Sequence, residues 1–154
     1  MVADYLRPFG ARILYTKRSR DRAAEQRFDI EYATLDDLVS QADVLSLHVP
    51  GNEQTRNLID ARLLMRAKPG LLLVNTARGG VIDESALIEA LRTGRIGGAA
   101  LDVFAQEPLR VDHPLRSLDN VILTPHVAAG SRDDLWLDRE IGPVIDAVVA
   151  AVSR

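Results

Sequence analysis

The chain has 154 residues, of which 47% are hydrophobic and 27% charged, with a net charge of −3. This size and composition suit one globular domain with its own core, and the lack of a basic block argues against a nucleic-acid surface. The sequence has no cysteine, which excludes disulfides and thiolate sites and agrees with a reducing compartment. No apolar run approaches the ~20 residues that span a bilayer, and no targeting segment is visible, so we expect a cytoplasmic protein.

Apolar, β-prone runs alternate along the chain with helix-like segments. After a helix end at residues 1–9, capped by Gly10, the sequence predicts strands at residues 11–16, 30–32, 43–50, 71–77, 98–104 and 120–125. Acidic first turns and Gly or Pro stops predict helices at residues 34–42, 60–70 and 83–96, and another from Ser131 onward that bends at Gly142 and Pro143. Apolar strands that alternate with helices indicate a doubly wound parallel sheet, a Rossmann-like α/β fold.

In such a fold, ligands bind at the carboxyl ends of the strands. One predicted strand ends in VNTARGG, which places Arg78 beside Gly79 and Gly80. The Arg could be a surface turn residue, or it could pair with Asp83 or Glu84 at the start of the next helix. It could instead present its planar, always charged fork to a carboxylate, with the glycines allowing close approach.

Glu107 and His126 also follow predicted strands on this rim. Taken singly, each could be an exposed loop residue or a hydrogen-bonded structural residue. Together with Arg78 they form a proton donor, a carboxylate that tunes it and an anion anchor, a set that suits reduction of a 2-oxo acid. We see no serine or cysteine nucleophile and no metal-ligand cluster, and we assign no role to His48 or His113.

The segments VNTARGGVIDESALIEAL, GAALDVFAQEP and DNVILTPHVAAGS resemble the D-isomer-specific 2-hydroxyacid dehydrogenases, in this order and along essentially the whole chain. The resemblance implies hydride transfer between NAD(P) and a small 2-hydroxy or 2-oxo acid, often by a homodimer. It implies that Arg78 binds the substrate, that His126 is the general acid/base and that Glu107 is its partner. The implied cofactor-binding residues are Val49, Pro50, Thr55, Asn75, Thr76, Ala77, Arg78, Asp102 and His126. One departure is Ala128, where the family often has glycine.

The segment ILYTKRSR predicts which cofactor is preferred. NAD-binding proteins of this fold usually place an acid after the second strand for the ribose hydroxyls, whereas this chain has Lys17, followed by Arg18 and Arg20. Cations attract a 2′-phosphate, so we expect NADP(H) to be preferred over NAD(H), unless these side chains simply solvate a loop.

No G-x-G-x-x-G occurs in the sequence. We therefore expect residues 1–154 to be a partial dinucleotide-binding domain that lacks the first strand and the glycine-rich loop, with the substrate domain absent. In the strand order 3-2-1-4-5-6, the missing strand would lie between the second and the fourth. Residues 11–16 would then lack a direct partner on that side, and they would either stay unpaired or close onto residues 43–50 across the gap. Unpaired buried backbone groups are costly, so we expect no open gap, and we expect residues 1–33 to be the least secure part of a weakened sheet.

Two functions remain open at this point. The chain is part of an NAD(P)-dependent oxidoreductase, or it is a non-catalytic dimerisation or regulatory module derived from that family.

Overall fold

The computed structural model describes residues 5–128 and 147–152, and its centre is a seven-stranded sheet in the order β2-β1-β7-β3-β4-β5-β6. The strands are β1 (Arg12–Thr16), β2 (Glu31–Tyr32), β3 (Val44–His48), β4 (Leu72–Asn75), β5 (Gly98–Leu101), β6 (Val121–Leu123) and β7 (Ala147–Val152). All pairings among β1 to β6 are parallel, which confirms the predicted doubly wound sheet. No helix in the described residues is long and apolar enough to cross a membrane.

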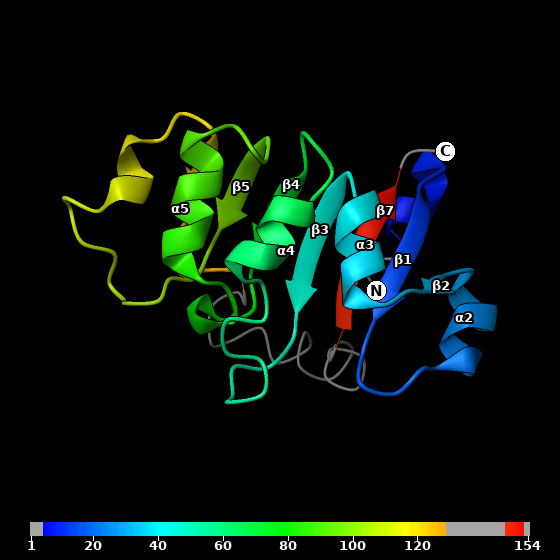
Figure 1. Cartoon of the computed structure of the whole chain (residues 1–154). Coiled ribbons are helices and arrows are strands. Elements are labelled where there is room, and N and C mark those ends of the chain that lie inside the picture. Colours follow the sequence, from blue (N-terminus) through cyan, green and yellow to red (C-terminus); the bar gives the residue numbers. More distant parts are fainter. Residues whose placement is uncertain (1–4, 129–146, 153–154) are drawn as a thin grey trace.

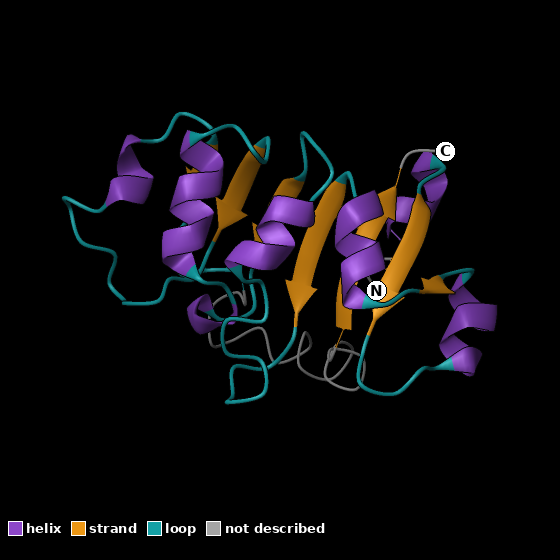
Figure 2. Ribbon diagram, in the orientation of Figure 1, coloured by secondary structure: helices purple, strands orange, loops and turns teal. Residues whose placement is uncertain are grey.

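Helices α3 (Leu35–Gln41), α4 (Ala61–Arg66) and α5 (Glu84–Arg92) lie side by side against one face of the sheet (Figure 2). They bury Leu38, Leu64 and Leu87 in one cluster with Leu45 and Leu73 of the strands. Removing such side chains from water, at roughly 25 cal/mol per Å² of apolar surface, is the main force that holds the layers together.

Each of these helices begins at a capping side chain. The side chains of Thr34, Asp60 and Asp83 accept a hydrogen bond from the backbone N–H three residues further on, as the sequence predicts. A further short helix, α2 (Arg22–Phe28), is capped by Asp21 in the same way. Sequence patterns do not predict α2, because none of its residues is buried and the segment therefore has no apolar stripe. The 3-10 turns are η1 (Arg7–Phe9), η2 (Gly79–Val81) and η3 (Pro114–Ser117).

Strand β7 fills the centre of the sheet. It lies between β1 and β3 (red between blue and teal in Figure 1) and runs antiparallel to both. Leu14 pairs with Ala150 on one side, and Leu45 pairs with the same residue on the other. The gap beside residues 11–16 is therefore closed, as expected, but both expected arrangements are wrong: these residues neither stay unpaired nor pair directly with β3, because β7 lies between them. A second strand ladder satisfies the N–H and C=O groups that an open gap would leave unpaired, at about 1–3 kcal/mol each.

The prediction of a helix from Ser131 to the C-terminus is wrong at Ala147–Val152, and its remainder lies outside the described residues. The sequence AVVAAV has no helix-breaking residue, but its valines are β-branched and the slot beside it offers a complete ladder. Hydrogen bonding to the two neighbouring strands stabilises this six-residue segment more as a strand than it would be stabilised as a short helix.

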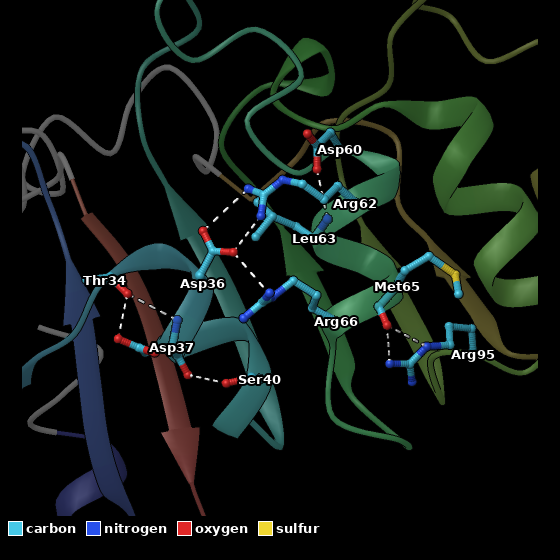
Figure 3. A network of polar contacts seen from close by, with 10 residues as sticks. All are labelled: Thr34, Asp36, Asp37, Ser40, Asp60, Arg62, Leu63, Met65, Arg66 and Arg95. Atoms are coloured by element: carbon cyan, nitrogen blue, oxygen red, sulfur yellow. Dashed lines mark hydrogen bonds and ion pairs between the residues drawn. The ribbon is translucent and has the colours of Figure 1, made fainter.

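Polar contacts link the helices on the outside of the sheet (Figure 3). The Asp36 carboxylate of α3 lies 2.5 Å from Arg62 and 3.3 Å from Arg66 of α4. Arg95, just after α5, donates to the carbonyls of Met65 and Ala67 and so satisfies the end of α4. These bonds link α3 to α4 and α4 to the segment after α5 at the outer surface of the helix layer.

Replacement of Ala150 by proline should open the centre of the sheet, because proline cannot donate a ladder hydrogen bond. We expect the free energy of unfolding to fall by about 1–3 kcal/mol and the amides of β1 to exchange faster, measured by denaturant unfolding and hydrogen exchange. Ala150→Gly keeps the N–H group and should lose less protection. Unchanged protection of Arg12–Thr16 in the proline variant would contradict the pairing of β7 with β1.

Candidate active site

Arg78 leaves the sheet directly after β4, and Asn75 shapes the turn that carries it. The Asn75 side chain is only 1% exposed. Its amide nitrogen donates to the Arg78 carbonyl at 3.1 Å, and its oxygen accepts from the Ala77 N–H at 3.0 Å. Asn75 therefore acts here by holding the backbone of residues 75–78, which directs Arg78 away from the core.

The Arg78 side chain is exposed and lies against Gly51, where a methyl group would come within 2.9 Å of its Cγ. Its Nη1 donates to the Ala77 carbonyl at 2.6 Å. Asp83 instead caps α5 through the Ala86 N–H, and Glu84 contacts His113 and the Ala105 N–H. The interpretation of Arg78 as a partner of these helix-start acids thus finds no support in their contacts.

Glu107 and His126 contact each other, although 19 positions separate them in the sequence. Oε2 of Glu107 lies 2.8 Å from Nδ1 of His126, and Oε1 accepts a hydrogen bond from the Phe104 N–H at 3.0 Å. The hydrogen bond with His126, followed by that from Phe104, holds the pKa of Glu107 below its usual value. The positive charge of Arg78 contributes in the same direction, which places Arg78 within electrostatic reach of the pair.

Asp102 fixes the backbone around His126. It is 4% exposed and accepts hydrogen bonds from Thr124 Oγ1 and from the backbone N–H groups of Val127 and Ala128. Burial is the largest influence and raises its pKa, yet the hydrogen bonds together lower the pKa of Asp102 below its usual value. This anchoring holds His126 at a φ of 56°, a left-handed conformation that is uncommon outside glycine.

With Nδ1 of His126 turned towards Glu107, Nε2 is the ring nitrogen left to exchange a proton with a ligand. Glu107 orients the ring, and its negative charge faces the imidazolium that forms when His126 takes up a proton. The three predicted catalytic residues therefore converge at one edge of the sheet. The arrangement can bind an anionic group and can give or take one proton.

The predicted residues of the cofactor cleft lie along the same edge. Thr55 donates to the Pro50 carbonyl at 2.5 Å and accepts from the Asn52 N–H at 3.0 Å, which closes the loop after β3 and Val49. Thr76 is exposed and Ala77 half-buried, both immediately beyond β4.

The cations that follow β1 each have a partner. Lys17 lies 3.6 Å from Asp21, and Arg18 donates to Gln54 at 2.7 Å. Arg20 makes two hydrogen bonds with Glu25, at 2.8 and 2.9 Å, and these bonds are the main cause that lowers the pKa of Glu25 to about 2. Arg20 is thus already bound to a carboxylate, whereas Arg18 reaches across to the loop after β3.

Arg78 also lines an open pocket of about 510 Å³ between the loop after β3 and the start of α5. Polar residues that the sequence does not predict to be part of a site share this pocket, among them Arg56, Asn57 and Ser85. Nothing in their spacing marks them, because the pocket joins segments that only the fold brings together. Within the described residues, no group of His, Asp or Glu side chains is arranged to hold a metal ion.

Comparison with known proteins shows the family to which the chain belongs. Residues 1–128 match the model of the family described as D-isomer specific 2-hydroxyacid dehydrogenase, NAD binding domain. The chain belongs to this family. It is 46% identical over 132 residues to a glyoxylate reductase of Aeropyrum pernix, which covers 86% of the chain and 39% of that protein.

Two solved structures of relatives are also similar. D-lactate dehydrogenase of Lactobacillus jensenii with NAD+ has a TM-score of 0.76 at 33% identity, over 84% of this chain and 42% of that one. A D-isomer specific 2-hydroxyacid dehydrogenase of Xanthobacter autotrophicus in complex with NADPH has a TM-score of 0.62 at 39% identity, over 64% and 32%. The chain spans about two fifths of the length of the glyoxylate reductase that it matches.

Glycine at position 79 is required by close packing, since a methyl group there would overlap the backbone of Phe104 and Ala105. We expect Gly79→Ala to lower the free energy of unfolding by about 1–3 kcal/mol, measured by urea unfolding. Gly80→Ala is the matched control, because a methyl group at Gly80 meets no atom within 4 Å; it should change the stability by less than about 0.5 kcal/mol. Equal effects of the two changes would refute the contact between Gly79 and the Phe104–Ala105 peptide.

Proposed function

We propose that this chain is the NAD(P)-binding and catalytic part of an oxidoreductase that transfers a hydride between NADP(H) and C2 of a small 2-hydroxy or 2-oxo acid. The observation that carries the proposal is the Glu107–His126 pair at 2.8 Å, within electrostatic reach of Arg78. Membership of the 2-hydroxyacid dehydrogenase family supports it. The reaction needs a group that binds a carboxylate and a group that transfers a proton, and Arg78 and the Glu107–His126 pair can supply them.

Each side chain has one task in this proposal. Arg78 binds the carboxylate of the substrate and polarises the adjacent carbonyl through its planar fork. His126 gives a proton from Nε2 to the carbonyl oxygen during reduction and takes it back during oxidation. Glu107 keeps the ring oriented and faces the imidazolium. The bound nicotinamide would supply or accept the hydride.

The residues present fit two parts of an NADP molecule. Val49 and Thr76 lie at the edge on which His126 lies, and Asp102 fixes the turn behind His126, so the nicotinamide would be placed at this edge. Lys17 and Arg18 follow β1, where cations suit a ribose 2′-phosphate. We therefore assign the phosphate to Lys17 and Arg18 first, since Arg20 is held by Glu25.

The pyrophosphate is the part of the cofactor with no counterpart among residues 5–128 and 147–152. A parallel strand in the slot between β1 and β3 would end at the carboxyl edge, where a glycine-rich turn and a helix N-terminus can bind phosphate. β7 instead enters the sheet at this edge, with Ala147 beside His48. Occupation of the slot by β7 favours a second candidate function, a non-catalytic dimerisation or regulatory module.

Replacement of Arg78 by lysine should test the first function. Lysine keeps the charge but cannot form two parallel hydrogen bonds, so kcat/KM for glyoxylate should fall about 100-fold. The assay uses NADPH with this chain and with a version extended upstream by a strand and G-x-G-x-x-G. The control is Arg92→Lys, at an exposed position of α5. If Arg78→Lys left turnover unchanged, the anchor role would be lost, and no turnover in either protein would favour the second function.

Arg18→Gln should separate the two cofactors. Loss of a charged partner for the 2′-phosphate should weaken NADPH binding about tenfold and leave NADH binding unchanged, as measured by nucleotide fluorescence on the extended protein. Arg22→Gln, at an exposed position on α2, is the control. Tighter binding of NADH than of NADPH by the unsubstituted protein would contradict the NADP preference.

Assembly into a homodimer and a cytoplasmic location stay predictions.

A further inference from the structure

Glu84 and His113 form a hydrogen-bonded pair that the reaction proposed above does not use. Glu84 is the first residue of α5, and its Oε1 lies 3.2 Å from Nε2 of His113. The two side chains are only 23% and 18% exposed. The pair joins the start of α5 to the loop that also carries Glu107.

The contacts of His113 define its tautomer. The Leu115 N–H donates to Nδ1 of His113 at 3.3 Å, so Nδ1 carries no proton. The ring proton is then on Nε2, which donates it to Glu84. His113 therefore serves two segments at once, capping η3 with one nitrogen and binding α5 with the other.

The second oxygen of Glu84 binds the loop itself. Oε2 accepts a hydrogen bond from the Ala105 N–H at 3.2 Å, while the preceding N–H, of Phe104, donates to Glu107. Adjacent backbone amides thus bind the two carboxylates, one on α5 and one in the site. Gly79, next to Arg78, packs directly on the peptide that joins Phe104 to Ala105.

The part of this loop that carries Glu107 is open to solvent. Residues 105–108 are exposed and belong to no helix or strand. An exposed segment of this kind samples several conformations unless hydrogen bonds select one. The Glu107 carboxylate therefore depends on its anchored neighbours for its position relative to His126.

We propose that Glu84 and His113 are positioning residues, which hold the Phe104–Ala105 peptide so that Glu107 meets His126 beside Arg78. The role builds on the proposed function, because it explains how the proton-transfer pair is kept in place. Glu84 contacts neither His126 nor a substrate in this arrangement, and it acts through the backbone of the loop.

Two substitutions test the proposal on the 154-residue protein without cofactor or substrate. Glu84→Gln leaves one acceptor oxygen for two donors, the Nε2–H of His113 and the Ala105 N–H, so one of these two hydrogen bonds is lost and the clamp on the loop is weakened. His113→Asn keeps an acceptor for the Leu115 N–H, as asparagine is a good capping residue, but it is too short to reach Glu84. We expect the Ala105 amide to exchange about tenfold faster in both variants and the pKa of Glu107 to rise towards its ordinary value. The readouts are amide exchange and carboxyl titration by NMR.

Glu89→Gln, at an exposed position of the same helix, is the matched control and should change neither readout. A merely structural role of Glu84 would lower the stability but leave the titration of Glu107 unchanged, and that result would overturn the proposal. If either variant fails to fold, the other still provides both readouts. Since no turnover is measured, failure of the proposed reaction would leave this outcome intact, and the two failures can be told apart.

Discussion

The structure depends on complete hydrogen bonding at the centre of its sheet. β1 and β3 each present a row of backbone N–H and C=O groups to the slot between them, and buried groups of this kind are costly when unpaired. β7 pairs with both rows, through residues such as Ala150. With the slot filled, the ends of β1, β3, β4, β5 and β6 stay in register, and the loops that follow them meet at one edge.

At that edge, the functional side chains are placed mainly by buried acceptors that bind backbone amides. Asn75 holds the turn that carries Arg78, and Asp102 holds the turn that carries His126. Neither acceptor needs to touch a substrate to determine the geometry of the site. The side chains of Arg78 and His126 can then face a ligand, while Asn75 and Asp102 hold the backbone that carries them.

The same slot bears on the choice between functions. An antiparallel strand satisfies the backbone as well as a parallel one does, but it reverses which end of the strand meets the ligand edge. β7 therefore stabilises the sheet and leaves the Glu107–His126 pair intact, yet it begins, rather than ends, at the edge where a pyrophosphate would bind. Stability of the fold and capacity for the dinucleotide are separate properties in this molecule.

The sequence by itself determined the alternation of strands and helices, the caps at Thr34, Asp60 and Asp83, and the family motifs around Arg78, Glu107 and His126. These features are local, because a cap or an apolar period is written within a few consecutive residues. Only the tertiary structure decided that AVVAAV becomes a central strand, that Glu84 reaches His113 and that Asp102 binds the turn after His126. Each depends on hydrogen-bond partners that are far apart in the chain. Such partners cannot be predicted from the spacing of residues, because only the folded chain brings them together.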